Sequence, residues 1–396
     1  MRVLLINSVC GIRSTGHICT DLAQQFEKEG HEVKIAYGRV DEVPEQFQKY
    51  AVRIGTDMDL KLHALRTRIL DEHGFGSKRA TKEFLKWAEE YDPDLVWMHN
   101  IHGYYINVEM LFAWIKSRPQ MQVKWTLHDC WAFTGHCSHF VAVGCEQWKT
   151  LCTTCQETHS YPASKLKSNC KNNYERKKNA FTGVKDLTLI TPSKWLAGLT
   201  RESFLGEYPV EVHYNTIDTA VFKPTPNNFK EKYSIGKKKI VLGVASTWTA
   251  RKGLYDFVKL SEMLDSNYII VLVGISQEEF VMKKNNDNIK AMPNTSLTDI
   301  TRSIETNVGI AIPSNINILY QTITEQKENA DKKEKAGILC IPRTNNPKEL
   351  AEIYTAADIF VNPTYEDTYP TVNLEARACG TQVITYNIGG CVETLL

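Results

Sequence analysis

Two acidic residues near the carboxyl end of the chain, Asp367 and Glu375, are separated by seven residues in a setting that suits a charged, hydroxyl-rich ligand. The apolar run 356–361 predicts a short buried strand, a Pro-Thr-Tyr loop then presents Glu366 and Asp367, and Glu375 lies at the start of the next helix. The N-terminus of a helix directs backbone N–H groups and the positive end of its dipole at an anion. Carboxylates accept hydrogen bonds from hydroxyl groups. The expected ligand is anionic at one end and rich in hydroxyls at the other, as a nucleotide-sugar is.

The spacing Asp367-x7-Glu375 resembles the acid-x7-Glu element of retaining glycosyltransferase family 4, whose members have the two-domain GT-B fold. The resemblance implies that the first acid holds hydroxyls of the donor sugar and that the second holds the ribose. The family more often has Glu at the first position, and Glu366 stands beside Asp367, so either acid can be the one that reaches the sugar. The alternative is an ordinary strand–loop–helix unit with surface acids. The resemblance also assigns the intervening residues to the donor: Thr368, Tyr369, Pro370 and Thr371.

A pair of basic residues, Arg251 and Lys252, follows a second predicted strand at 241–245. Many members of family 4 carry an Arg and a Lys in this segment, both on the donor diphosphate. Lys252 matches that Lys, and Arg251 beside it can substitute for the Arg, which is missing from its usual place. The resemblance implies that these cations neutralise the leaving nucleoside diphosphate, so that catalysis requires no metal or other cofactor. An exposed basic pair before a helix is the alternative.

Three histidines follow predicted strands in the first half of the chain, and doubly wound sheets form their pockets at such strand ends. His99 and His102 follow one strand, and His128 follows another in Thr126-Leu-His-Asp129. The latter resembles the strand-end histidine of family 4. This implies that His128 lies under the donor sugar and acts by hydrogen bonding and electrostatic positioning. His99 and His102 are assigned to the acceptor side, and structural histidines are the alternative for all three.

A glycine-bounded turn, Gly11-Ile-Arg-Ser-Thr-Gly16, follows the first predicted strand and opens a helix. Its Gly-x4-Gly spacing is that of a Walker loop. However, His17 and Ile18 stand where Lys and Ser or Thr would be required, which disfavours ATP-type phosphate chemistry. The turn resembles the glycine loop with which family 4 enzymes approach acceptor and donor, so Gly16 is assigned to the donor and His17 to the acceptor. A plain tight turn is the alternative.

The elements that position these residues alternate between strand and helix, which predicts an α/β fold of mostly parallel sheets with helices on both faces. Together with the resemblance, this predicts a GT-B arrangement of two doubly wound Rossmann-like domains facing across a cleft. The expected helices include 14–29, 82–91 and 347–354. The expected strands are 3–7, 32–37, 95–98, 123–127, 187–191, 210–214, 239–245, 268–273, 338–341, 359–362 and 383–386.

We expect an acceptor-side domain at 1–215, with a Cys-rich loop at 130–170, and a nucleotide-sugar-binding domain at 216–396. The boundary lies in Val212–Pro224, which resembles the family's Asn-Gly-Ile-Asp-x3-Phe interdomain element. A long polar segment near 276–335 is interpreted as an insertion, because connections in compact domains are usually much shorter. The chain is also expected to be truncated, because family members continue beyond the point where this sequence stops.

Eleven cysteines are many for a chain without a secretory signal, and a disulfide framework is therefore disfavoured. Four thiolates can hold zinc in a tetrahedral site, which would close a loop that has few apolar residues of its own. Reduced buried thiols and disulfides are the alternatives. The candidate ligands of this structural zinc are Cys137, Cys145, Cys152 and Cys155.

The composition is that of a globular protein of 396 residues with 42% hydrophobic residues. The net charge of +1 argues against a nucleic-acid partner, whose binding surface would be strongly basic. No apolar run approaches the ~20 residues needed to cross a bilayer, so the chain is expected to be cytoplasmic. Between Lys165 and Lys185 seven basic residues face only Glu175. This segment predicts peripheral contact with the inner face of a membrane or with a lipid pyrophosphate, and a solvated helix face is the alternative.

Together these features predict a hexosyltransferase-type glycosyltransferase that uses a UDP- or GDP-type nucleotide-sugar. The expected acceptor is a glycan or lipid-linked saccharide in surface polysaccharide assembly, such as capsule or lipopolysaccharide. One rival is another GT-B enzyme, such as a nucleotide-sugar 2-epimerase. A second rival is a non-catalytic partner subunit that binds nucleotide-sugar.

Overall fold

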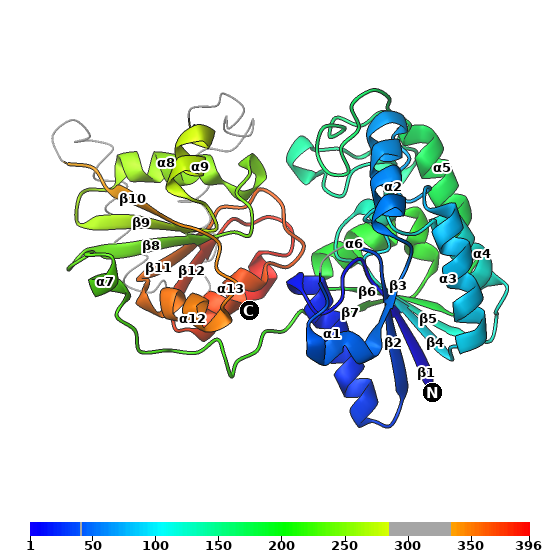
Figure 1. Ribbon diagram of the computed structural model, residues 1–396. Coiled ribbons are helices and arrows are strands. Elements are labelled where there is room, and N and C mark those ends of the chain that lie inside the picture. The colour runs from blue at the N-terminus through cyan, green and yellow to red at the C-terminus, as the bar shows by residue number, and fades with distance from the viewer. Residues whose placement is uncertain (40–41, 285–333) are drawn as a thin grey trace. The chain divides into compact units, whose positions relative to one another are not determined.

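The computed structural model describes residues 1–39, 42–284 and 334–396. The chain divides into two compact units, Met1–Tyr214 and Asn215–Leu396, and each is built around one parallel sheet (Figure 1). The predicted α/β class with two doubly wound sheets is confirmed. Most of the predicted insertion, from residue 285 to residue 333, lies outside the described residues.

The first unit contains a seven-stranded sheet in which all neighbouring strands are parallel, in the order β3-β2-β1-β4-β5-β6-β7. The order reverses between β1 and β4, and ligands of doubly wound proteins bind at such a point, beyond the carboxyl ends of the strands. The strands are β1 (Arg2–Ile6), β2 (Glu32–Tyr37), β3 (Ala51–Arg53), β4 (Leu95–Met98), β5 (Gln122–Thr126), β6 (Leu187–Thr191) and β7 (Val210–Val212).

Helices cover both faces of this sheet (Figure 1). Alternate residues of β1 enter two different cores, because successive side chains of a strand point to opposite faces. Val3 and Leu5 pack in the same core as Cys19 and Ala23 of the first helix. The helices are α1 (Arg13–Lys28), α2 (Asp57–Leu70), α3 (Lys78–Tyr91), α4 (Val108–Lys116), α5 (Cys170–Phe181) and α6 (Lys194–Glu202).

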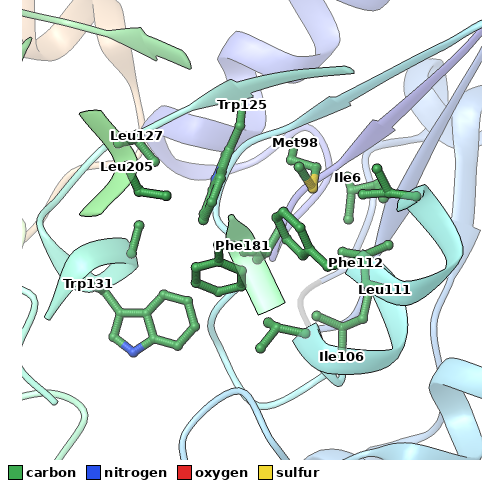
Figure 2. Close-up of a cluster of buried hydrophobic side chains, with 14 of the residues drawn as sticks. Ile6, Met98, Ile106, Leu111, Phe112, Trp125, Leu127, Trp131, Phe181 and Leu205 are labelled. Carbon is green, nitrogen blue, oxygen red and sulfur yellow. The ribbon is translucent and has the colours of Figure 1, made fainter. Parts of the chain in front are cut away.

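The larger core lies between the other face of the sheet and helices α3, α4 and α5, and it is rich in aromatic side chains (Figure 2). Phe181 lies 4.6 Å from Phe112 and 5.0 Å from Trp125, measured between ring centroids. Trp125 also donates a hydrogen bond from Nε1 to the backbone oxygen of His99, at 3.1 Å. The packing of this core therefore holds the chain where it leaves β4.

The second unit contains a five-stranded parallel sheet in the order β10-β9-β8-β11-β12, which reverses between β8 and β11. Leu242 and Phe360 pack on one face with Tyr354 and Ala376 of the covering helices. The strands are β8 (Lys239–Val244), β9 (Tyr268–Val273), β10 (Gly337–Ile341), β11 (Ile359–Asn362) and β12 (Gln382–Thr385). The helices are α7 (Phe229–Lys232), α8 (Leu254–Met263), α9 (Gln277–Lys284), α12 (Pro347–Ala356) and α13 (Thr371–Ala378).

Candidate active site

In the second unit, the predicted donor residues meet at the point where the strand order reverses. A short 3-10 turn, Ala250–Lys252, follows β8, and the loop after β11 carries the acids. Nζ of Lys252 lies 2.6 Å from Oδ2 of Asp367, and the two side chains are 24% and 19% exposed. The predicted cation and the predicted first acid therefore form a partly accessible ion pair.

Three hydrogen bonds tie the turn that carries Lys252 to the loop that carries Asp367. Nη1 of Arg251 donates to the backbone oxygen of Glu366 at 2.6 Å. The backbone oxygen of Arg251 accepts from the N–H of Tyr365 at 2.8 Å and from the hydroxyl of Thr364 at 3.3 Å. Arg251 thus positions the loop, while Lys252 is the cation that faces the acid.

A glycine permits this close approach of the two segments. Gly253 has a φ of +72°, and a Cβ atom there would lie 2.2 Å from the backbone oxygen of Pro363. Such a distance is far below van der Waals contact, so any other residue would separate the turn from the loop. A positive φ is also readily adopted only by glycine.

The two neighbouring acids have different surroundings. Glu366 is 1% exposed, whereas Asp367 faces Lys252 and also accepts a hydrogen bond at Oδ1 from the N–H of Tyr369, at 3.3 Å. Of the two acids between which the sequence left the choice open, Asp367 is the one that lies against the cation.

Glu375 lies within α13, where the hydroxyl of Tyr354 donates a hydrogen bond to Oε2 at 3.0 Å. Burial raises the pKa of the Glu375 carboxyl, and hydrogen bonds from Tyr354 and Thr371 partly offset that rise. Pro370 precedes the first turn of α13, and Thr368 and Tyr369 are buried in the loop before it. Tyr354 belongs to α12 and was not predicted, because no spacing in the sequence relates it to Glu375.

In the first unit, the predicted histidines gather at the carboxyl ends of β4 and β5. Nδ1 of His99 lies 3.1 Å from Nε2 of His128, and the two rings are stacked. Nε2 of His102 lies 3.0 Å from Oδ2 of Asp129, and its Nδ1 lies 3.2 Å from the hydroxyl of Tyr161. Tyr161 comes from the Cys-rich loop, and nothing in the sequence marked it as a neighbour of His102.

The histidine pair is neutral near pH 7. Burial lowers the pKa of His99 well below its usual range. Burial likewise lowers the pKa of His128 to about 4, against the opposing charge of Asp129. Burial would raise the pKa of Asp129, but the charge and hydrogen bond of His102 outweigh it and the pKa is lowered overall. Two neutral imidazoles beside an ionised carboxylate can orient hydroxyl groups and do not supply a positive charge.

The glycine turn after β1 packs against the first helix, and a residue before it links two strand ends. Gly16 is buried, and a Cβ atom there would lie 3.1 Å from Cγ2 of Val9, so the turn packs closely against the start of α1. Asn7 joins the ends of two strands, because its Oδ1 accepts from the N–H of Asn100 at 3.2 Å. His17 is exposed on α1 and is not among the contacts of the histidine group.

The cysteines of the first unit form a cluster that differs from the predicted set by one residue. All eleven cysteines of the chain are free thiols. Cys155 accepts hydrogen bonds from Cys137 and Cys170, which raises the pKa of these two donors and lowers that of Cys155. Cys152 contacts Cys170, whereas Cys145 is only half-buried and its sulfur accepts from the backbone of Gln147. We name the thiol cluster by its four members, Cys137, Cys152, Cys155 and Cys170.

The structural zinc stays a prediction. Among the residues that the structure describes, no group of three or more His, Cys, Asp or Glu side chains is arranged to hold a metal ion as it stands. The thiols are instead hydrogen-bonded to one another. Within the same part of the chain, no helix is long and apolar enough to cross a membrane.

Two family models match this sequence. The model described as Glycosyltransferase Family 4 matches residues 16–221, and the model described as Glycosyl transferases group 1 matches residues 323–396. Together they include parts of both units.

Curated relatives are similar over short segments. "Putative colanic acid biosynthesis glycosyl transferase WcaC" of Escherichia coli K12 is 33% identical over 78 residues, which is 19% of each chain. D-inositol 3-phosphate glycosyltransferase of Rhodococcus opacus is 46% identical over 44 residues, 11% of this chain and 10% of the relative. The matched part thus spans less than a fifth of these relatives.

Solved structures are similar over nearly the whole chain. Sucrose-phosphate synthase of Thermosynechococcus elongatus has a TM-score of 0.59 at 16% identity, covering 98% of this chain and 82% of that one. HepE of Anabaena, in complex with UDP and glucose, has a TM-score of 0.55 at 13% identity, with coverages of 99% and 82%. WaaG, a glycosyltransferase involved in lipopolysaccharide biosynthesis, has a TM-score of 0.54 at 14% identity, with coverages of 98% and 82%. At such identities the likeness establishes the fold, which is GT-B.

Proposed function

Because the chain belongs to glycosyltransferase family 4, we propose that it transfers a hexosyl group, with retention of configuration, from a nucleotide-sugar to a glycan or lipid-linked saccharide. The observation that carries this proposal is the ion pair between Lys252 and Asp367. It brings a cation suited to a diphosphate within 2.6 Å of an acid suited to sugar hydroxyls, at the strand ends where such ligands bind.

In this proposal Lys252 binds the diphosphate, Asp367 accepts from hydroxyls of the sugar, and Glu375 accepts from those of the ribose. The start of α13 adds the positive end of a helix dipole. Negative charge on the diphosphate grows as the glycosidic bond breaks, so a cation that is already in place stabilises the transition state more than the bound donor. The hydrogen bond from Lys252 to Asp367 holds the lysine at that position in advance.

The transfer itself exchanges one bond at the anomeric carbon for another. The bond from that carbon to the diphosphate oxygen breaks, and the electron pair leaves with the phosphate. The oxygen of the acceptor hydroxyl then bonds to the same face of the carbon, and its proton passes to the departing phosphate oxygen. His128, neutral near pH 7, is suited to hydrogen bonding with the transferred sugar rather than to taking a proton.

Similar proteins support a UDP-type donor and a role in surface polysaccharide assembly. HepE has been solved with UDP-glucose, WaaG is described as acting in lipopolysaccharide biosynthesis, and WcaC is named for colanic acid biosynthesis. These descriptions apply to the similar proteins. The donor base and the acceptor of this chain are identified by the experiment that follows.

The test is to titrate the purified chain with UDP, GDP and other nucleoside diphosphates by calorimetry and then to assay transfer from the matching nucleotide-sugars. We expect one nucleoside diphosphate to bind preferentially and the product to keep the anomeric configuration of the donor, as judged by NMR. A product of inverted configuration would refute retention. Release of free epimerised sugar without acceptor would favour the epimerase, and donor binding without any turnover would favour the non-catalytic subunit.

A further inference from the structure

A buried carboxylate, Asp256, lies close in sequence to the turn that carries Lys252. It is the third residue of α8, which begins directly after Gly253, and it is only 4% exposed. The hydroxyl of Tyr365 donates a hydrogen bond to its Oδ2 at 2.7 Å, and the hydroxyl of Tyr386 donates to the same carboxylate. A buried carboxylate is costly unless hydrogen bonds replace its hydration, so these two donors are what compensate its charge.

The two tyrosines come from different strand ends. Tyr365 lies in the loop after β11, two residues before Asp367, and its N–H donates to the backbone oxygen of Arg251. Tyr386 directly follows β12. Both tyrosines are buried, and their ring centroids lie 5.7 Å apart. Asp256 thus joins three segments of the chain, which follow β8, β11 and β12.

The segment that follows Tyr386 also contacts the backbone of Asp367. The N–H of Gly390 donates to the backbone oxygen of Asp367 at 3.0 Å. A Cβ atom at Gly389 would lie 2.1 Å from the same oxygen, so any larger residue there would push the two segments apart. The backbone of Asp367 is therefore fixed by two segments, each of which carries a tyrosine that binds the same buried carboxylate.

We propose that Asp256 is a positioning residue of the donor site, which holds the acid loop and the turn after β12 so that Asp367 meets both Lys252 and the donor sugar. This inference rests on the proposed function, because it concerns the same Lys252–Asp367 pair. An ionised carboxylate accepts two charge-assisted hydrogen bonds at once, and such bonds fix direction as well as distance. Asp256 touches neither donor nor acceptor and acts through Tyr365 and Tyr386.

A carboxylate at this place is better explained by positioning than by folding. Burial raises the pKa of Asp256, and the hydrogen bonds of the two tyrosines and the charge of Lys259 offset only part of that rise. A well-packed apolar side chain of similar size would not carry the cost of a buried charge. The groups that face the carboxylate are Tyr365 and Tyr386 from the two loops and Lys259 from its own helix.

The test compares Asp256→Asn, Tyr365→Phe and Tyr386→Phe with the parent in transfer and in nucleoside diphosphate binding. Asp256→Asn should lower kcat/KM for transfer by roughly tenfold or more, which corresponds to a hydrogen bond to a charged group. Each Phe variant removes one of the two hydroxyls and should show part of that loss. The dissociation constant of the nucleoside diphosphate, measured by calorimetry, should change much less, because Lys252 and Glu375 are still present.

The pH dependence of transfer separates positioning from a general loss of stability. The ionised carboxylate is the form that binds both hydroxyls, so activity should be complete above the pKa of Asp256 and fall below it. Tyr365→Phe removes a hydrogen bond that lowers this pKa, so the acidic limb of kcat/KM should move to higher pH. The move should be absent when Tyr365→Phe is combined with Asp256→Asn, which has no carboxyl group to titrate. A variant that is only less stable would melt at a lower temperature without moving the limb.

Tyr255→Phe and Glu262→Gln are the matched controls, because both residues lie on α8, where Tyr255 is half-buried and Glu262 is exposed. Both variants should transfer as the parent does at every pH. Transfer by Asp256→Asn as fast as that of the parent would overturn the proposal, as would an acidic limb that Tyr365→Phe does not move. If Asp256→Asn does not fold, the two Phe variants decide the matter. A parent that transfers no sugar would refute the proposed function as well, whereas an active parent with equally active variants would refute only the role of Asp256.

Discussion

The polar cluster at the strand ends of the second unit and the one at the strand ends of the first unit differ in charge and in exposure. The cluster of the second unit is an ion pair, Lys252 with Asp367, in a partly exposed position. The cluster of the first unit is built on neutral imidazoles, of which His99 is 2% exposed and has a strongly lowered pKa. In the proposed transfer, the charged cluster would bind the departing diphosphate and the neutral cluster would orient a hydroxyl group.

The supports of the two clusters differ as well. Gly253 and hydrogen bonds of Arg251, Thr364 and Tyr365 hold the ion pair, whereas an aromatic core that includes Trp125 holds the histidines. A cluster held by a few local hydrogen bonds responds mainly to substitutions of the residues that make them. A cluster held by a packed core responds to substitutions within that core, because interiors are close-packed.

Metal binding by the thiol cluster would weaken the contrast between a charged second unit and a neutral first unit. A bound metal would give the first unit a buried charged centre. We expect the reduced protein to carry about one zinc per chain, since four thiols that contact one another are the ligand type and number of a tetrahedral zinc site. Burial lowers the pKa of the adjacent Lys177 to about 7, and the neighbouring cysteines offset only part of that fall. Elemental analysis measures the metal, and chelation should lower the melting temperature strongly.

Cysteine variants identify the ligands. Cys170→Ser should lose the metal as Cys155→Ser does, whereas Cys145→Ser should keep it. If the protein contains no metal and chelators do not change its melting temperature, the cluster consists of buried reduced thiols.

The donor cation is expected to give the largest effect on transfer. Lys252→Ala should cost roughly 2–4 kcal/mol of transition-state stabilisation, as the loss of one preorganised contact to developing charge does. The loss is measured as kcat/KM for transfer, with the melting temperature as a check on folding. Lys348→Ala, an exposed lysine of α12 in the same unit, is the control and should be neutral. If the activity of Lys252→Ala stays within a few-fold of the parent, Lys252 does not bind the departing diphosphate.

The buried His63 of the first unit should make the free energy of unfolding depend on pH. Burial lowers the pKa of His63 from 6.5 to about 4, so the folded state resists a proton that the unfolded chain accepts. The free energy of unfolding is then complete above pH 6.5 and falls as the pH drops toward 4, by roughly 3 kcal/mol from His63.

Denaturant unfolding as a function of pH measures this fall. His63→Gln should flatten it in part, and His213→Gln, which replaces an exposed histidine, should leave it unchanged. A free energy of unfolding that does not change between these pH values would mean that His63 is protonated in the folded state.

The acids of the second unit should separate nucleotide from sugar. Glu375→Gln should weaken binding of the bare nucleoside diphosphate by about 1.5–3 kcal/mol, the contribution of a charged hydrogen-bond acceptor. Asp367→Asn should leave that binding nearly unchanged and reduce transfer. Calorimetry and a transfer assay on the same samples measure both. Glu262→Gln, an exposed acid of α8, is the control. Because Glu366 is buried, its substitution reports on folding as well as on function.

His128→Gln is expected to give the smallest effect, because a neutral hydrogen bond contributes about 0.5–1.5 kcal/mol. Transfer should fall by roughly tenfold at most, while the dissociation constant of the nucleoside diphosphate stays unchanged. Steady-state kinetics with calorimetry tests this. A loss as large as that of Lys252→Ala would mean that the first unit also stabilises developing charge.

The strands and their ends could be predicted from the sequence to a large extent. Five strands, among them Leu95–Met98 and Ile359–Asn362, have the predicted bounds, because buried parallel strands are short apolar runs with distinct limits. The residues that follow strands were therefore found as well, including His128 and Lys252. Their mutual contacts follow from the parallel order of the strands.

Other features depend on tertiary structure and left no signal in the sequence. Helix α2 was missed, because its apolar stripe faces outward and its buried side is polar. Tyr161 and Cys170 reach their clusters through the folding of the Cys-rich loop, so sequence spacing alone selected Cys145 instead of Cys170. The order of neighbouring residues could not show that Glu366 is buried and that Asp367 lies at the cation.

The contact between Gly253 and Pro363 has a consequence for how such an enzyme can change its donor. The turn and the loop are held together by the contact of Gly253 with Pro363 and by hydrogen bonds of residues 251 and 364–366. None of these contacts uses a side chain of residues 368–371. In the proposed function residues 368–371 contact the donor, so their side chains could be replaced to suit a different sugar while Lys252 and Asp367 keep their distance. Substitutions that change sugar preference could thus accumulate in the loop while Lys252 still stabilises the departing diphosphate, provided that Gly253 is kept.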